Sequence, residues 1–329
     1  MTTKTTKFRV ATVYDKDYVL DFCKNTFSWG DYIDRVWDIW IREPNSIFLV
    51  AVVNENNIEK PIAISHGILI PEKIGWIEGI RVDPKYRSRK LATNMSLHIL
   101  EYARKNGALY SSAIVSIKNE ASKGLMEKLG FKVISTWSYL SIKPIDLLPE
   151  LKNFTIDNST TTTTIKVANL NEYQQILNFL NQSDIFKASG KKFVNSWRWY
   201  DLTEDRLKIM INNRQVIILV NNDDNDHEKE KKIRGIAIID EEGYWNNQNI
   251  FQIVYIDAHS DDLLLSLVIK CVEFIILKEE NKNEEKNYSE NKYERMQIFS
   301  PSPIKDNSLI FQKFNINFSE QFLLYHKEI

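Results

Sequence analysis

The chain has 329 residues, a formal net charge of −1, and 43% hydrophobic and 12% aromatic residues. This length accommodates two domains with hydrophobic cores, and the balanced charge argues against nucleic acid or a membrane surface as the main partner. The polar N-terminus lacks a signal-peptide core, and no stretch reaches the roughly 18 apolar residues of a membrane helix. Cys23 and Cys271 form no metal-ligand spacing, which is typical of buried thiols in a reduced, cytoplasmic protein.

Strand and helix patterns alternate along residues 8–142 in the manner of a mixed α/β (α+β) domain. Apolar alternation and β-branched runs predict strands, and apolar residues at helical spacing predict helices. The expected strands cover 8–12, 47–53, 61–70, 76–82 and 111–117, with a pair of final strands over 131–142. The expected helices cover 15–27, 31–41, 93–105 and 120–128.

The stretch from Trp76 to Ala92 joins a strand to a helix through a basic turn. Its strand ends before Pro84, because proline has no N–H to donate to a neighbouring strand. Directly before the helix, the turn carries the cations Arg87, Arg89 and Lys90. A helix N-terminus adds unpaired backbone N–H groups and the positive end of the helix dipole. The stretch therefore predicts an anion site, most simply for a pyrophosphate.

This turn resembles the acetyl-CoA loop of the GNAT superfamily of N-acetyltransferases, which reads Gln/Arg-x-x-Gly-x-Gly/Ala. The run from Arg87 to Ala92 matches the first and last positions, with Lys90 where the family has its first glycine. A second signature follows in the family's order: Asn119, then Ala121, then Glu-Lys-Leu-Gly-Phe at 127–131. The wider run over 8–142 is similar to the branch that includes histidine N-acetyltransferases.

The resemblance implies acetyl-CoA as cofactor and a set of residues that hold it. The backbone of two residues in the strand 76–82 would pair with the pantetheine arm where neighbouring strands splay apart, and the turn would hold the pyrophosphate. The expected cofactor contacts are Ile80, Val82, Arg87, Ser88, Arg89, Lys90, Leu91, Ala92, Thr93, Asn119 and Met126. Met126 stands where the family often has a tyrosine as general acid, so an acid has to come from elsewhere.

Glu78 is the expected general base, because it is a polar residue on a buried strand face, together with Trp76, Ile80 and Val82. Its alternative role is a structural ion pair with Arg81 or Arg42. Two tyrosines, Tyr86 before the loop and Tyr139 on a late strand, are alternative proton donors. His66 is a further candidate proton carrier. No metal site is expected.

The second half repeats the pattern of the first. After a linker over 144–164, the segment 165–169 echoes 8–12, 176–179 echoes 19–22 at the same offset, and 311–314 stands where 126–129 did. The turn over 257–262 carries three aspartates and no Arg, Lys or Gly, so a phosphate would be repelled there. We therefore expect a GNAT acetyltransferase domain over 1–143 and a degenerate GNAT-like domain over 165–329.

Together these patterns favour an acetyl-CoA dependent N-acetyltransferase that acts on a small amine, with an amino acid as one candidate, or on a peptide or protein amino group. The alternative is a non-catalytic module that binds acyl-CoA or a protein partner. Binding of nucleic acid is disfavoured by the charge balance. The acceptor and the oligomeric state are left open by the sequence.

Overall fold

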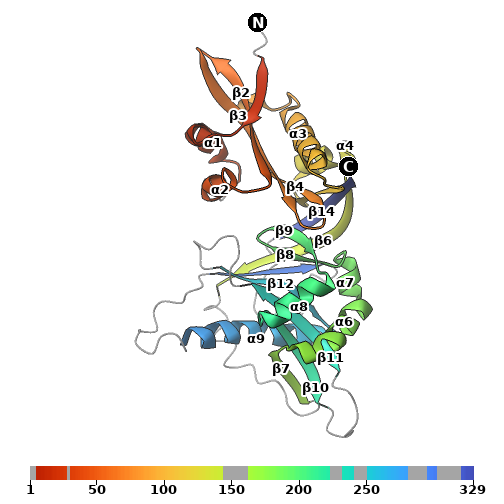
Figure 1. Ribbon diagram of the computed structural model, residues 1–329. Helices are drawn as coiled ribbons and strands as arrows, with labels where there is room; N and C mark the ends of the chain where they lie inside the picture. Colours follow the sequence, from red (N-terminus) through yellow and green to blue (C-terminus); the bar gives the residue numbers. More distant parts are fainter. Residues whose placement is uncertain are drawn as a thin grey trace. The chain divides into compact units, whose positions relative to one another are not determined.

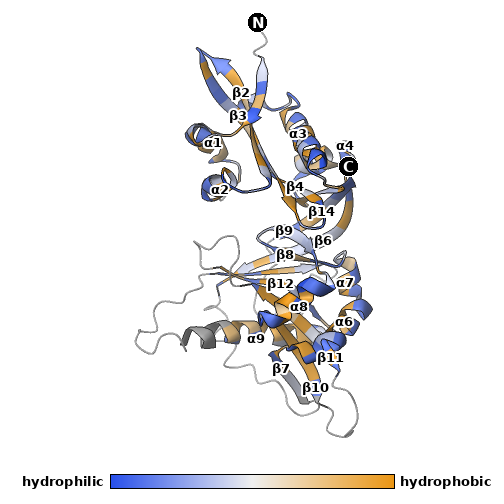
Figure 2. Cartoon of the chain, viewed as in Figure 1, coloured by the Kyte–Doolittle hydropathy of each residue, from blue (hydrophilic) through white to orange (hydrophobic). Residues whose placement is uncertain are grey.

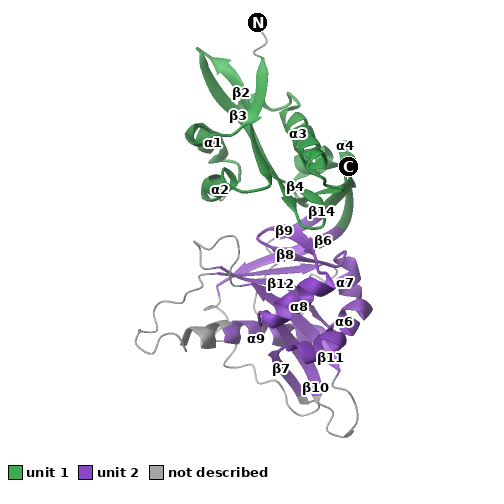
Figure 3. Ribbon diagram, in the orientation of Figure 1, with its two compact units in different colours: residues 1–134, 324–329 green, residues 135–323 purple. Residues whose placement is uncertain are grey.

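The computed structural model describes residues 5–27, 30–143, 162–222, 232–240, 250–280, 295–301 and 320–329, without the side chains of 162, 222 and 275–280. The chain divides into two compact units, which are coloured in Figure 3. The first unit comprises Met1–Ile134 and Leu324–Ile329, and the second comprises Ser135–Leu323. This division differs from the expected limits of 1–143 and 165–329 in two ways. The first stretch of the first unit already ends at Ile134, and the last residues of the chain, from Leu324, belong to the first unit.

The strands of the first unit lie in the order β1, β2, β3, β4, β5 and β14. Its strands are β1 (Thr6–Val10), β2 (Ser46–Glu55), β3 (Ile58–Ile70), β4 (Ile74–Val82), β5 (Tyr110–Ser116) and β14 (Glu320–Glu328), whose residues from Leu324 belong to this unit. The strands β1 to β4 pair antiparallel with their neighbours, and β4 pairs parallel with β5.

Helices cover both faces of this sheet (Figure 1). They are α1 (Lys16–Cys23), α2 (Ile33–Trp40), α3 (Leu91–Lys105) and α4 (Glu120–Lys128). The backbone of α3 approaches the sheet closely at two glycines: a Cβ on Gly67 would lie 2.3 Å from Ile99, and one on Gly75 would lie 2.5 Å from Ala103. The helices α1 and α2 lie on the opposite face of the sheet (Figure 1).

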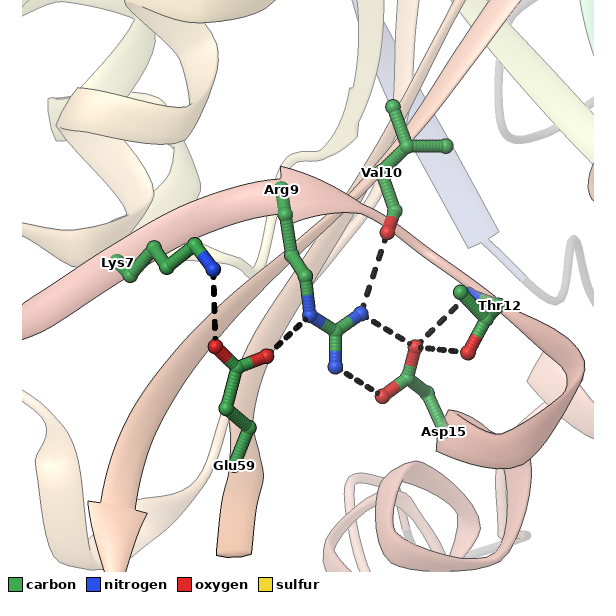
Figure 4. Close-up of polar contacts among 6 residues, drawn as sticks. All are labelled: Lys7, Arg9, Val10, Thr12, Asp15 and Glu59. Atoms are coloured by element: carbon green, nitrogen blue, oxygen red, sulfur yellow. Dashed lines mark hydrogen bonds and ion pairs between the residues drawn. The ribbon is translucent and has the colours of Figure 1, made fainter. Parts of the chain in front are cut away.

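A surface ion network around the buried carboxylate of Asp15 fixes the entrance from β1 into α1 (Figure 4). The guanidinium of Arg9 donates two hydrogen bonds of 2.7 Å to the carboxylate of Asp15 and one of 2.8 Å to Glu59. Asp15 also accepts hydrogen bonds from the backbone N–H and the hydroxyl of Thr12, at 2.8 and 3.0 Å. Asp15 is buried, so these donors replace the water that its charge would lose.

The strands of the second unit lie in the order β6, β13, β12, β11, β10 and β7. Its strands are β6 (Lys132–Ile142), β7 (Thr162–Val167), β10 (Val216–Asn222), β11 (Ile233–Asp240), β12 (Ile250–Ala258) and β13 (Arg295–Pro301), with a separate hairpin of β8 (Lys192–Asn195) and β9 (Arg198–Asp201). Figure 2 shows the apolar colouring of β10 to β12, which lie between the helices. The helices are α6 (Tyr173–Gln182), α7 (Asp184–Ala188), α8 (Glu204–Asn212) and α9 (Asp261–Glu280).

Two details of the expected layout are corrected. The expected pair of final strands is one strand, β6. Its antiparallel partner is β13, which comes from a distant part of the sequence. The expected linker ends earlier than 164, because β7 begins at Thr162. The expected echo at 311–314 lies outside the described residues.

The internal repeat reappears in local structure. In both halves the first strand leads into a capping box, formed by Thr12 with Asp15 and by Asn169 with Glu172, and then into a helix. In the second half, β10 pairs antiparallel with β11, as β2 pairs with β3 in the first. Cys23 and Cys271 are free and buried, as expected. Among the described residues, no helix combines the length and apolarity needed to cross a membrane.

Candidate active site

The strands β4 and β5 stop pairing part of the way along β4. They pair over Ile74–Trp76 and Tyr110–Ser112, whereas β3 continues to pair with β4 as far as Val82. The edge of β4 that faces β5 is therefore released from the ladder after Trp76. A released strand edge presents N–H and C=O groups that an extended ligand can pair with. The expected contacts Ile80 and Val82 lie in this released segment.

A β-bulge lies beside this separation. Opposite His66 stands Glu78, but opposite Ile64 stands Arg81, so β4 has one residue more than β3 in this interval. Gly79 lies within the bulge with φ +65, a conformation that residues with a Cβ rarely adopt. A Cβ at this position would also lie 2.5 Å from the ring of Trp40. The bulge thus requires glycine for two independent reasons.

The bulge overturns the expected facing of Glu78. Residues paired across neighbouring strands point to the same face of a sheet. Glu78 pairs with His66, and Trp76 pairs with Ile68, so both lie on the face of His66. Beyond the bulge Arg81 takes this face, and Val82 pairs with Ala63 on the other. The expectation that Glu78 shares a face with Ile80 and Val82 is wrong, because the extra residue shifts the alternation by one.

Glu78 lies in a cluster with one histidine and a second glutamate. Its Oε1 lies 2.9 Å from Nδ1 of His66, and its Oε2 accepts a hydrogen bond of 3.1 Å from Nε1 of Trp76. On the other side of the imidazole, Nε2 lies 3.6 Å from Oε2 of Glu43. The expected alternative partners are engaged elsewhere: Arg81 pairs with Asp31, and Nε of Arg42 donates to the carbonyl of Asp38.

His66 is held between these carboxylates in a buried aromatic environment. Its side chain is 0% exposed, and its ring stacks on Trp40 with centroids 4.5 Å apart and planes 5° from parallel. Within the described part of the chain, Nε2 has no hydrogen-bond partner at close range. Glu43, His66 and Glu78 bring one ligand atom each within 4.8 Å of one another, a spacing that a metal ion also tolerates. Because the two carboxylates flank opposite ring nitrogens, the arrangement suits proton transfer better than coordination of one ion.

Tyr32 and Arg81 lie beside this cluster and were not predicted as site residues from the sequence. Tyr32 lies against Trp40, with ring centroids 6.1 Å apart, and under the guanidinium of Arg81 at 5.1 Å. Arg81 is fixed by two hydrogen bonds to Asp31, of 2.6 and 3.0 Å. Burial raises the pKa of the Tyr32 hydroxyl. The Arg81 guanidinium opposes this shift, and the nearby carboxylates of Glu78 and Asp31 add to it. Tyr32 is therefore a neutral hydrogen-bonding group near Glu78 at neutral pH.

The basic turn after β4 has the backbone of an anion site. Ser88 and Lys90 adopt left-handed conformations, with φ of 63° and 58°. Lys90 thus takes the conformation for which the family uses glycine, at some cost in strain. It precedes α3 and makes no side-chain cap, so the N–H groups of the first helical turn, at Leu91, Ala92 and Thr93, point to the turn. Arg87, Ser88, Arg89 and Lys90 are exposed around them.

The two candidate tyrosines are not brought to Glu78 by a described contact. Tyr86 is buried, and its hydroxyl donates a hydrogen bond of 2.8 Å to Glu55 at the end of β2. Burial and the Glu55 carboxylate raise the pKa of Tyr86. Tyr139 belongs to the second unit, where its hydroxyl oxygen accepts a hydrogen bond of 3.1 Å from Gln297 and burial raises its pKa.

The second family signature spans α4, with Asn119 at the N-terminus of the helix and residues 127–131 at and just after its C-terminal end. The side-chain oxygen of Asn119 caps this helix by accepting a hydrogen bond of 3.1 Å from the N–H of Ser122. Met126 is only 2% exposed and contributes to the core of the first unit. The side chain of Met126 has no group that could transfer a proton.

The corresponding turn of the second unit, between β12 and α9, is acidic. Asp257 is 2% exposed and accepts hydrogen bonds from the hydroxyls of Ser183 and Tyr255. Burial raises the pKa of the Asp257 carboxyl. Asp261 and Asp262 occupy the first turn of α9, where negative side chains already complement the helix dipole.

Comparison with solved structures identifies the fold. The GCN5-related N-acetyltransferase from Sphaerobacter thermophilus matches with a TM-score of 0.59 at 11% identity, over 98% of this chain and 95% of that one. A tandem GNAT protein from the clavulanic acid biosynthesis pathway matches with a TM-score of 0.51 at 11% identity, over 98% of both chains. A putative acetyltransferase from Thermoplasma acidophilum matches with a TM-score of 0.50 at 13% identity, over 98% of this chain and 100% of that one.

The family match lies in the first half. No curated protein matches the chain. Residues 14–131 match the acetyltransferase (GNAT) family, and this segment contains the bulge of β4, the basic turn and α4. The complete chain therefore has the mixed α/β fold of tandem GNAT proteins, and its segment 14–131 matches the acetyltransferase (GNAT) family.

Proposed function

We propose that the first unit is an acetyl-CoA dependent N-acetyltransferase that acts on a primary amine. The observation that carries this proposal is the release of β4 from β5 just before Glu78, on the strand that leads into the basic turn. One strand thereby presents a carboxylate, a backbone edge that no longer pairs with β5, and an anion site in sequence. On this edge the Ile80 carbonyl accepts a hydrogen bond of 3.0 Å from Nη1 of Arg81. The order matches the acyl end, the pantetheine arm and the pyrophosphate of the cofactor.

Acetyl-CoA, when bound, would supply the activated acyl carbon and a thiolate leaving group. The turn from Arg87 to Lys90 and the N-terminus of α3 would hold its pyrophosphate, and the released edge at Ile80 and Val82 would hold its arm. The amide of Asn119 would approach the arm from α4. These assignments follow the family's pattern and the exposed cations of the turn support them.

Glu78 acts as the general base in this proposal. Its carboxylate removes one proton from the acceptor ammonium and passes it to His66. It takes the second proton as the amine nitrogen forms its bond to the acyl carbon and the C–S bond breaks, and the departing thiolate is protonated from solvent to give free CoA. His66 receives a proton at Nδ1 from Glu78, and Nε2 faces the carboxylate of Glu43. The buried imidazole between two carboxylates thus extends the proton path away from the acceptor.

The alternative is a module that binds acyl-CoA without turnover. It is favoured by Met126, which is buried where the family often has its acid, and by the strained Lys90. We favour the enzyme, because the Glu43–His66–Glu78 cluster places three ionisable groups at the released strand, an arrangement that binding alone does not need. The second unit, with its acidic turn, is proposed to have lost its cofactor site.

The test is incubation of the full chain with labelled acetyl-CoA and a pool of amino acids, polyamines and short peptides. We expect a labelled amide together with an equal amount of free CoA. Calorimetry should give one bound acetyl-CoA per chain. Binding without labelling of any amine would favour the module, and a stoichiometry of two would show that the second unit retains a site.

A further inference from the structure

The end of the chain contributes a titratable pair to the first unit. His326 lies on β14, and its Nδ1 is 2.8 Å from the hydroxyl of Ser112 on β5. Its ring also stacks on Tyr110, with centroids 5.0 Å apart and planes 27° from parallel. Ser112 is 2% exposed, whereas His326 is half-buried. A hydrogen bond and a ring contact thus hold the imidazole in one orientation.

This pair lies on the same face of the sheet as Glu78. Ser112 pairs with Trp76 and Tyr110 pairs with Ile74, and paired residues of neighbouring strands share a face. Trp76 in turn donates its indole N–H to Glu78. Ser112 is also the last residue of β5 that pairs with β4, so the pair stands where the strands begin to separate. From strand spacing, the backbones of Glu78 and Ser112 are about 8 Å apart.

The two sides of Trp76 differ in charge and in hydrogen-bonding character. The side of Glu78 and Glu43 has two carboxylates and attracts an ammonium group. The side of Ser112 and His326 has a hydroxyl and an imidazole, which can donate hydrogen bonds to an oxygen. A molecule that carries an amine and, a few atoms away, an oxygen acceptor complements both sides at once.

We propose that His326, oriented by Ser112, binds a carboxylate or carbonyl oxygen of the acceptor and selects amines that carry such a group. The inference rests on the proposed function, since it names the class of acceptor for the same site. It also gives the C-terminal strand a role in the active site of the first unit. The acceptor class is then an amino acid or the amino end of a peptide rather than a simple amine or polyamine.

The experiment compares three forms of each acceptor with the full chain: L-tyrosine, L-tyrosine amide and tyramine, and likewise L-lysine, L-lysine amide and cadaverine. Wild-type kcat/KM should be about tenfold or more higher for the forms with the oxygen group than for the bare amines, the range of one charge-assisted hydrogen bond. A preference for the amino acid over its amide identifies a carboxylate, and the reverse preference identifies a peptide-like carbonyl.

In His326→Ala this preference should fall to about twofold or less, chiefly through a higher KM for the acceptor, while the KM for acetyl-CoA stays within about twofold. Ser112→Ala, which loses the orienting hydroxyl, should show a smaller loss in the same direction. His98→Ala is the matched control, because His98 is exposed on α3. If His326→Ala does not fold, His326→Gln and Ser112→Ala provide the same comparison.

Equal rates for the three forms in the wild type, or a preference that survives in His326→Ala, would overturn the inference and leave the proposed function intact. Absence of turnover of all six compounds and of every other amine in the wild type would refute both. A fall in kcat for all acceptors with an unchanged preference would mean that His326 is structural, and would also overturn the inference.

Discussion

Replacing Glu78 with glutamine separates the proposed base from the structural role of the same side chain. The carboxylate has two acceptor oxygens, one toward Nδ1 of His66 and one toward the indole N–H of Trp76. Glutamine keeps the shape but offers one oxygen and one NH₂ group. If its oxygen accepts from Trp76, its NH₂ group faces Nδ1 of His66.

The cluster can accommodate this change because the imidazole has two tautomers. With its proton on Nε2, His66 accepts from glutamine at Nδ1 and points its N–H toward Glu43, 3.6 Å away. No buried donor then faces another donor, so the stability cost should be about 1 kcal/mol, the net value of one hydrogen bond. For a unit of this size, that corresponds to a shift of about 2–8 °C in the unfolding temperature.

The catalytic cost should be much larger. Removal of a general base typically lowers the rate by about 10²- to 10⁴-fold, and we expect a fall in kcat within this range with acetyl-CoA affinity nearly unchanged. The assay is release of the CoA thiol with the best amine of the pool, together with calorimetry and thermal unfolding. Glu59→Gln, on the same strand pair but in the surface network of Figure 4, is the matched control. A loss below tenfold at full folding, or a loss explained by unfolding alone, would refute the assignment of the base.

Three further predictions concern the surroundings of the site. Arg87→Glu and Arg89→Glu should each weaken acetyl-CoA binding more than about tenfold, because they reverse a charge-assisted contact; unchanged affinity in both, by calorimetry, would rule out the turn. Gly79→Ala should lower the free energy of unfolding of the first unit by about 2–4 kcal/mol, because of its positive φ and the contact of the new Cβ with Trp40. Gly107→Ala, at a positive φ but with nothing within 4 Å, should lower it less, as measured by denaturant unfolding. Asp15→Asn should cost about 2–4 kcal/mol. Burial opposes the Asp15 charge, but Arg9 and Thr12 hold the pKa of Asp15 below its usual value; this contribution is therefore present above the ordinary pKa of an aspartate, about 3.9, and is lost as the pH falls through the lowered value. The variant should accordingly lose less stability than the wild type below that pH.

The local sequence pattern was sufficient to predict most strands and helices of the first unit. The β-branched run before Pro84 predicts β4, and the cations before the apolar helix predict the turn and α3. Glu78 was predicted as a polar residue on a strand face, and its cross-strand neighbour His66 follows from the register of β3 and β4. The bulge was missed, although a glycine inside a strand, Gly79, is a known signal for one.

What the sequence could not provide depends on contacts between distant segments. Glu43 follows α2 in a loop and reaches His66 only through the packing of Trp40 on the imidazole. Nothing in the local pattern of β14 indicates that its last residues join the first unit, some 210 residues after β5, so the pair of Ser112 and His326 (|i−j| 214) was not predictable. The expected pair of strands over 131–142 is the single strand β6, and this stretch contains no glycine or proline that would divide it.

A crystal structure of the full chain with a non-hydrolysable acetyl-CoA analogue tests the central claim most directly. The account predicts one analogue per chain, with its pyrophosphate on the N–H groups of Leu91 to Thr93, its arm paired to β4 at Ile80 and Val82, and its acyl group near Glu78. An amine nitrogen next to the acyl carbon should then lie within about 3 Å of the Glu78 carboxylate or one water away. An analogue bound outside the interval between β4 and β5, or one whose acyl group is remote from Glu78, would contradict the account.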